Sequence, residues 1–111
     1  MIYQEYESTF SNNHRTYDLN KIFKFVHNKK TRLLDISKLK WMFKHIDKLN
    51  KNRINKADIN IPIIITKEND RYIVVDGMHR LQKSINNNKT VIPYKYLSKK
   101  ELNQSLIKEL I

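Results

Sequence analysis

The chain has 111 residues, enough for one compact domain, and its 22 Lys and Arg against 11 Asp and Glu leave a net charge of +11. The absence of cysteine excludes a disulfide framework, a thiolate zinc site and a thiol nucleophile. No apolar run approaches the ~18 residues of a membrane span, and the acidic, mixed start MIYQEYESTF does not resemble a signal peptide. We therefore expect a soluble, cytoplasmic protein without a membrane partner.

The positive charge has two explanations. A basic surface attracts phosphate-bearing partners, so it favours DNA, RNA or a nucleotide. Lysine, asparagine and isoleucine are all abundant, as in chains that AT-rich genes encode, so much of the lysine could instead reflect coding bias on solvated faces. Charge alone therefore does not establish nucleic-acid binding.

The N-terminal part carries the weakest structural signal. Residues 1–16 are polar with scattered aromatic side chains, and we assign them to an N-terminal arm or extension. Residues 17–111 are assigned to a single domain. Asp18 can cap a helix, because apolar residues follow it at helical spacing through Val26, although KIFKFV also fits a strand.

The next segments predict a strand, a helix and a loop. TRLLDI, residues 31–36, is short and apolar like a strand. Ser37 can cap a helix that follows. The inward face of that helix would carry Leu39, Met42, Phe43, Ile46 and Leu49. NKNRINKADIN, residues 50–60, is typical of a polar loop.

The second half predicts a hairpin, a helix, a strand and a final helix. Two β-branched runs flank Glu68–Asp70, and a helical pattern follows Gly77 to about Asn86. TVIPYKYL, residues 90–97, indicates another strand, and Ser98 begins a capping box. The inward face of the last helix would carry Leu102, Leu106, Ile107 and Leu110. This order predicts an α+β fold, a small mixed sheet with flanking helices.

The junction between the hairpin and the next helix carries the strongest functional pattern. The stretch DGMHR, Asp76–Arg80, follows the apolar run YIVV and contains the only glycine of the chain. The first amides of a helix are unpaired and carry the positive end of its dipole, and a glycine there leaves room for a phosphate. Arg80 adds a guanidinium fork. Lys83, one turn later, could extend the basic rim or simply be a solvated helix lysine. The pattern predicts an anion site at a helix N-terminus.

Two residues of this stretch could add chemistry. His79 could donate to a phosphate or transfer a proton near neutral pH. Asp76 could orient that imidazole, accept a proton or hold a hydrated Mg²⁺. Each residue alone also has a structural explanation, because Asp-Gly is a common turn and an aspartate can simply cap a helix. Together, at one strand–helix junction, they favour a functional site.

PIIITKENDRYIVVDGMHRLQKSINNNKTVIPYKYL, residues 62–97, resembles the core of the ParB/sulfiredoxin superfamily. Members share a hairpin ending in Asp-Gly-x-His-Arg, a helix and an Ile-Pro strand. Small stand-alone ParB-like proteins also carry Arg-x-x-x-Ala-Asp before the first strand, which Arg53–Asp58 matches. The resemblance implies a ParB/sulfiredoxin-like fold with Asp76 and His79 as catalytic candidates. The implied phosphate and nucleotide ligands are Gly77, Met78, His79, Arg80, Lys83, Arg53 and Asp58.

The family's activities carry over only in part. Sulfiredoxins use a cysteine where this chain has Met78, and a thioether cannot be that nucleophile, so sulfinic-acid repair is not expected. Chromosome-partitioning ParB proteins bind CTP with a later motif and a helix-turn-helix domain, which this sequence lacks, so partitioning is not expected either. The free serine kinases of the superfamily have Asp-Gly-His-His-Arg for phosphoryl transfer, and Asp76, Gly77, His79 and Arg80 match that loop.

We therefore predict a nucleotide-binding domain that takes ATP, ADP or CTP, with Mg²⁺ as a candidate companion. If it is an enzyme, its reaction would be phosphoryl transfer or nucleotide hydrolysis. A second hypothesis is a non-enzymatic basic module for DNA, RNA or an acidic protein. Tyr94 and Tyr96 alternate on the last strand, where they could stack bases or simply be half-buried. A ParB-like nuclease ranks third, because only Asp58 and Asp76 are ready metal ligands, and no resident metal site is predicted.

Overall fold

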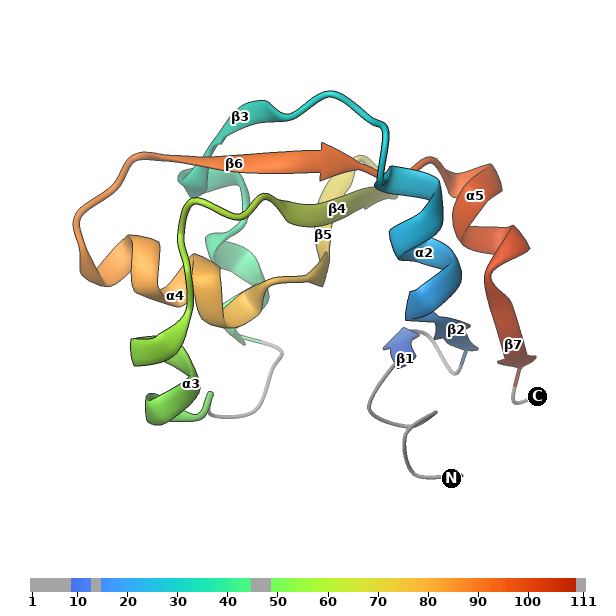
Figure 1. Ribbon diagram of the computed structural model, residues 1–111, viewed down its shortest axis with the longest axis horizontal. Coiled ribbons are helices and arrows are strands. Elements are labelled where there is room, and N and C mark those ends of the chain that lie inside the picture. The colour runs from blue at the N-terminus through green and yellow to red at the C-terminus, as the bar shows by residue number, and fades with distance from the viewer. Residues whose placement is uncertain (1–8, 13–14, 45–48, 110–111) are drawn as a thin grey trace.

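A computed structural model describes residues 9–12, 15–44 and 49–109 of the chain. The strands are β1 Thr9–Asn12, β2 Arg15–Asp18, β3 Arg32–Asp35, β4 Ile63–Glu68, β5 Arg71–Asp76, β6 Val91–Tyr96 and β7 Leu106–Glu109. The helices are α2 Leu19–Val26, α3 Lys51–Lys56, α4 Met78–Asn86 and α5 Lys99–Gln104, with the 3₁₀ helices η1 Ile36–Lys38 and η2 Lys40–Lys44 (Figure 1). The predicted α+β class is confirmed.

The described strands form two separate sheets. β3, β6, β4 and β5 make a mixed four-stranded sheet in that order, in which β4 and β6 run parallel and the other neighbours run antiparallel. β1, β2 and β7 make a three-stranded antiparallel sheet, which lies near the lower ends of α2 and α5 in Figure 1. The mixed sheet was predicted, whereas the second sheet was not.

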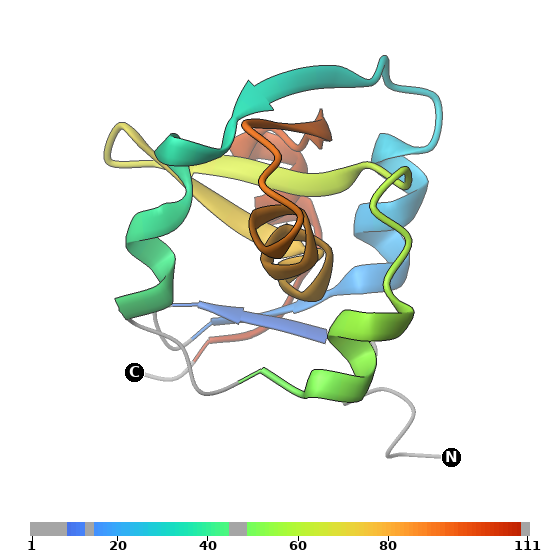
Figure 2. The same ribbon diagram turned by 90° about the vertical axis from the view of Figure 1, so that its left-hand side faces the viewer.

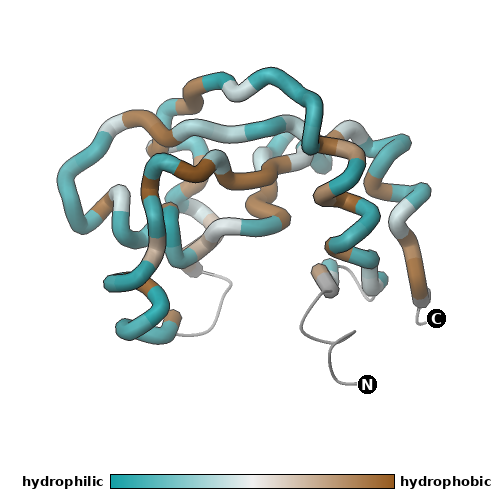
Figure 3. The backbone as a smooth tube through the Cα atoms, in the orientation of Figure 1, coloured by the Kyte–Doolittle hydropathy of each residue, from teal (hydrophilic) through white to brown (hydrophobic). Residues whose placement is uncertain are grey.

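Within the mixed sheet, β4 and β5 are buried on both faces. Successive residues of these strands point to opposite sides and enter two different cores. One face belongs to the α4-side core, made by Leu34, Ile36, Leu39, Ile63, Ile65, Val74, Leu81 and Ile92. The other belongs to the α2-side core, made by Tyr17, Leu19, Ile22, Val26, Ile64, Val75, Leu97 and Leu102. Figure 3 shows the apolar run of β4 at the centre, and Figure 2 shows α4 beneath the sheet, end-on.

The β4–β5 hairpin confirms its prediction and has a specific turn. Asn69 and Asp70 have φ values of 51° and 63°. Positive φ at both central residues defines the type I′ turn, which matches the twist of two-residue hairpins and favours Asn and Asp. Near its other end the hairpin has a bulge, because Ile64 pairs with Asp76 while the next residue, Ile65, pairs with Val74. The bulge redirects the strand immediately before the α4 turn.

The helix predicted from Ser37 is wrong, because two short 3₁₀ helices replace it. Asp35, not Ser37, is the cap: its Oδ1 accepts from the Ser37 amide at 2.9 Å. In η2, Trp41 Nε1 donates to the Tyr72 carbonyl oxygen at 3.1 Å, and Met42 Sδ accepts from the Val74 amide at 3.1 Å. These contacts cover the free edge of β5. The predicted inward residue Ile46 lies outside the described residues.

The predicted loop at residues 50–60 is also partly wrong, because Lys51–Lys56 form α3. Asn50 caps this helix by accepting from the Arg53 amide at 3.1 Å. None of its residues is buried, so no apolar periodicity could reveal it. Its other end is held by Lys83, whose Nζ donates to the Asn55 and Ala57 carbonyl oxygens at 2.7 and 2.8 Å.

The last helix is shorter than predicted. Ser98 and Glu101 form the expected capping box, and Leu102 is buried as expected. The helix ends at Gln104, however, and Leu106 and Ile107 lie exposed in β7, which pairs with β2. The predicted inward residue Leu110 is outside the described residues.

At the N-terminal side, Asp18 caps α2 as predicted, with its Oδ1 2.9 Å from the Asn20 amide nitrogen. The alternative of a strand across KIFKFV is therefore excluded. β1 and the start of β2 lie within residues 1–16, which were assigned to the arm. Across the described ranges, no helix combines the length and the apolar character that crossing a membrane would require.

Candidate functional site

Gly77 is required by the packing of the α4 turn onto β4. It has a φ of +117°, in the region that L side chains rarely adopt. A Cβ at this position would lie 2.5 Å from Ile63 Cγ2 and 2.8 Å from Ile63 Cβ. Ile63 is fully buried in the α4-side core and cannot retreat. The glycine thus has a structural role that does not depend on any ligand.

The same geometry leaves the start of α4 open. Gly77 occupies the N-cap position, and no side chain caps the helix there. The first helical hydrogen bond runs from the Leu81 amide to the Gly77 carbonyl oxygen at 2.9 Å. The three amides before Leu81 have no carbonyl within the helix to bind. They carry the positive end of the helix dipole, which is favourable for an anion.

Arg80 clamps this turn to the chain before β4. Its Nη1 donates to the Pro62 carbonyl oxygen at 2.6 Å and to that of Ile61 at 3.4 Å. Its Nη2 donates to Asp76 Oδ2 at 2.7 Å, which forms an ion pair. The Arg80 side chain is only 18% exposed. Both ends of the guanidinium therefore form hydrogen bonds within the protein, and its positive charge offsets the negative charge of Asp76.

A pocket of about 330 Å³ opens at this turn, and we call it the turn pocket. Its lining consists of Arg53, Lys56, Ala57, Asp58, Ile61, Asp76, Gly77, His79 and Arg80. The lining comes from α3, from the segment that leads to β4, from the end of β5, and from the start of α4. Residues far apart in the sequence, Arg53 and Asp58 on one side and Asp76–Arg80 on the other, are thus brought together.

Two of the predicted ligands do not line the turn pocket. Met78 is half-buried against the α4-side core. Lys83 is engaged by the carbonyl oxygens at the end of α3, so it fixes α3 against α4. Lys56, in contrast, lines the pocket and was not predicted. Its spacing of three from Arg53 would have pointed to it only if α3 had been recognised as a helix.

Burial and a neighbouring charge both act on His79. Desolvation lowers its pKa below the ordinary 6.5, and the positive charge of Arg53 lowers it further. The imidazole is therefore mainly neutral at pH 7 and has an acceptor nitrogen. A bound phosphate would oppose both effects, because a negative charge nearby favours the imidazolium.

The charges around the turn pocket are mixed. Arg80 and Asp76 cancel within their ion pair, and the Asp58 carboxylate accepts from the Asn60 amide at 2.9 Å. Arg53 and Lys56 are exposed, and neither forms an ion pair with a carboxylate in the described part of the chain. The rim is therefore weakly cationic, in addition to the helix dipole.

No group of three or more His, Asp or Glu side chains within residues 9–12, 15–44 and 49–109 could hold a metal ion. Asp58 and Asp76 line one pocket, but the second is held by Arg80. Comparison of the whole chain with protein-family models, curated proteins and solved structures finds no match.

Proposed function

We propose that the protein binds the phosphate groups of a nucleotide in the turn pocket. The observation that carries this proposal is the uncapped start of α4, which opens into a pocket with Arg53 and Lys56 at its rim. Free helix amides and nearby cations are the two features that phosphate sites in proteins share.

The neighbouring surface suits the remainder of a nucleotide. A second hollow of about 240 Å³ adjoins the turn pocket and shares Ile61, Asp76 and Arg80 with it. Phe23, which is 42% exposed, and the Pro62 ring lie in its lining. An exposed aromatic ring beside a phosphate site offers a face for a nucleobase. A nucleotide therefore fits the pair of hollows better than a free phosphate does.

The resemblance of Asp76–Arg80 to the nucleotide loop of the ParB/sulfiredoxin superfamily supports the same proposal and suggests ATP, ADP or CTP as the ligand. In this chain the loop's arginine would act mainly by holding the turn, since its guanidinium is occupied by Asp76 and Pro62. Direct phosphate contacts would come from the α4 amides, Arg53 and Lys56.

If the site also transfers a phosphoryl group, His79 is the residue we assign to proton transfer. Its lowered pKa leaves a neutral imidazole that can accept a proton from an attacking hydroxyl or water. Asp76 is less suited to that role, because its Oδ2 already accepts a hydrogen bond from Arg80 Nη2 at 2.7 Å. Asp76 would then be a positioning residue that fixes Arg80.

The test is isothermal titration of the full chain with ATP, ADP, CTP and inorganic phosphate, each with and without Mg²⁺. The informative variant is Arg53→Ala with Lys56→Ala, because both side chains are exposed and neither holds the turn. We expect it to lower nucleotide affinity about 10-fold or more, since each lost hydrogen bond to a charged group contributes about 1.5–3 kcal/mol.

The matched control is Lys99→Ala with Lys100→Ala, which removes the same charge from exposed positions of α5. It should leave the affinity within about twofold. Equal losses in both variants would show that binding depends on overall charge and would contradict the proposal. So would the absence of measurable binding for every nucleotide tested. Arg80→Ala is not diagnostic, because it also removes the clamp.

A further inference from the structure

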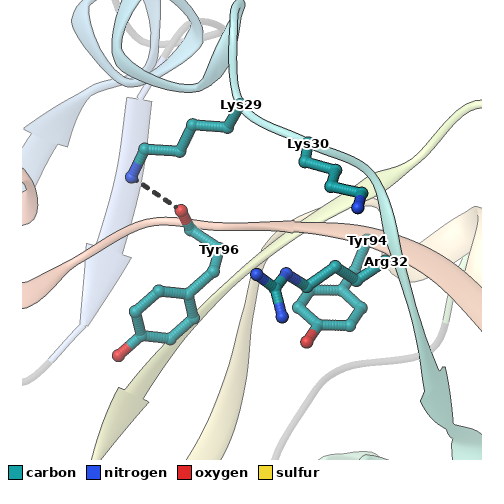
Figure 4. Close-up of a pocket in the computed structure, with 5 residues that line it drawn as sticks. All are labelled: Lys29, Lys30, Arg32, Tyr94 and Tyr96. Carbon is teal, nitrogen blue, oxygen red and sulfur yellow. Dashed lines mark hydrogen bonds between the residues drawn. The ribbon is translucent and has the colours of Figure 1, made fainter.

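Another hollow, of about 410 Å³ and lined by basic residues, lies apart from the turn pocket and the hollow that adjoins it, where the α2–β3 loop crosses the end of β6. We call it the tyrosine pocket. Its lining consists of Lys29, Lys30, Arg32, Tyr94 and Tyr96 (Figure 4). It shares no lining residue with the turn pocket and contains no carboxylate in its lining.

The two tyrosine rings lie on one side of β6. Tyr94 and Tyr96 are two residues apart in the strand, so their side chains leave the same face about 7 Å apart along it. Figure 4 shows both rings hanging below the strand. Tyr94 packs partly against the α4-side core, whereas Tyr96 belongs to neither core cluster and is 37% exposed. Core packing therefore does not account for the Tyr96 ring.

The cations beside these rings are held in two different ways. Lys29 Nζ donates to the Tyr96 carbonyl oxygen at 2.8 Å and forms an ion pair with Glu101, so it fastens the loop to β6. Arg32 lies directly opposite Tyr94 in the β3–β6 register, and Lys30 precedes it by two residues. Both are exposed, and within the described part of the chain neither forms an ion pair.

We propose that the tyrosine pocket binds single-stranded nucleic acid, with bases on the tyrosine rings and phosphates on Lys30 and Arg32. Aromatic rings beside a basic groove are the features by which proteins hold single strands without reading sequence. The flat face of a base can stack on the ring of Tyr96 or Tyr94. The chain's net charge of +11 favours binding of a polyanion.

The arrangement favours a single strand over other polyanions. In a duplex the base faces are stacked on one another and cannot reach a ring, so the tyrosines would contribute nothing. An acidic peptide could pair with Lys30 and Arg32 but has no series of flat faces. The fastened Lys29 loop also means that the pocket needs little ordering when the strand binds.

The experiment measures fluorescence anisotropy of the full chain with labelled oligothymidylate and oligouridylate of about 12 nucleotides, within the site sizes of known single-strand binders. A duplex of equal length and polyglutamate serve as competitors. We expect Tyr96→Leu to weaken binding by about 5- to 100-fold, the range for the loss of one stacked base. Tyr96→Phe keeps the ring and should bind like the unchanged chain.

The role of the two exposed cations is tested with the double variant Lys30→Gln with Arg32→Gln. Each phosphate contact with a single strand contributes about 0.7 to the slope of log K against log salt concentration, so this variant should reduce the slope by about 1.4. Lys51→Gln with Lys89→Gln removes the same charge from exposed positions away from the pocket and should leave the slope unchanged. Thermal unfolding followed by circular dichroism verifies that each variant is folded.

Three results would overturn the proposal. Tyr96→Leu could bind as tightly as Tyr96→Phe, which would remove the stacking role. The duplex or polyglutamate could compete as well as the single strand, which would indicate a general cation surface. The Lys51→Gln with Lys89→Gln control could reduce the salt slope as much as Lys30→Gln with Arg32→Gln does, which would show that the charge acts diffusely rather than in the pocket.

Discussion

The turn pocket and the tyrosine pocket both gather lysine and arginine, but Arg80 of the first and Arg32 of the second are held differently. In the turn pocket Arg80 is nearly buried and bound to Asp76 and two carbonyl oxygens, so it belongs to the framework. In the tyrosine pocket Arg32 and Lys30 are exposed and project from an edge strand and its loop. The difference shows that a basic residue in a motif can be structural while an unremarkable one is available to a ligand.

The two pockets also differ in what else they offer an anion. The turn pocket presents backbone amides at the start of α4, whose positions Gly77 and Ile63 determine. The tyrosine pocket presents aromatic rings and side-chain cations. The first arrangement suits a compact phosphate group in a defined place, and the second suits an extended polymer.

The largest expected effect is that of Gly77→Ala. The methyl group would meet Ile63 at 2.5 Å and would stand on a backbone with φ of +117°. Strain and overpacking should together lower the free energy of unfolding by about 3–5 kcal/mol in urea denaturation. Asn86→Ala, at the exposed end of the same helix, should change it by less than about 0.5 kcal/mol. Equal stability of the two variants would mean that the turn is not packed as described.

Separate substitution of Arg80 and Arg32 by methionine tests the contrast between these two side chains directly. Arg80→Met leaves the Asp76 carboxylate and the Pro62 carbonyl oxygen without their donor, and should destabilise the fold by about 1.5–3 kcal/mol. Arg32→Met removes an exposed side chain and should cost less than about 0.5 kcal/mol. Urea midpoints measure both, and similar losses would contradict the assignment of Arg80 alone to the framework.

The ion pair that fastens the tyrosine pocket should have a smaller effect. Burial acts to raise the pKa of Glu101, but hydrogen bonds from Lys29 and Ser98 outweigh it and lower the pKa below the ordinary 4.5. The carboxylate therefore stabilises the fold above pH 4.5, and that contribution is lost as the pH falls through the lowered pKa. Glu101→Gln should cost about 1 kcal/mol or less at pH 7, since the pair is partly exposed. The difference in the free energy of unfolding between Glu101→Gln and the unchanged chain should vanish in acid. A difference that does not depend on pH would contradict this account.

His79 should give the smallest effect, a change in the pH dependence of stability. Because its pKa in the folded chain is lowered, the unfolded chain binds the proton more readily. The contribution of His79 to the free energy of unfolding should therefore be fully present above pH 6.5 and should decline as the pH falls below that value. His79→Gln should make the urea midpoint less sensitive to pH between about 5 and 7. A saturating nucleotide should offset part of this lowering of the pKa, because the phosphate charge favours the imidazolium, and the resulting proton uptake should be detectable by calorimetry in two buffers.

Elements with local signals were predictable from the sequence. Asp18 caps α2, Ser98 and Glu101 form a capping box, and Asn69 and Asp70 make the hairpin turn, as their residue types indicated. Elements without such signals were missed. The second sheet pairs β2 with β7, whose residues lie some ninety positions apart, so no local pattern could reveal the pairing.

The amino-acid sequence by itself determined the α+β class, the strand–turn–helix at Gly77 and the excess of positive charge. Only the tertiary structure decided what the residues of that turn do. It placed Ile63 against Gly77, closed Arg80 on Asp76, and brought Arg53 and Lys56 to the open end of α4. The reason is physical: caps and turns depend on neighbours within a few residues, whereas steric contacts and ion pairs between distant segments exist only once the sheet has formed.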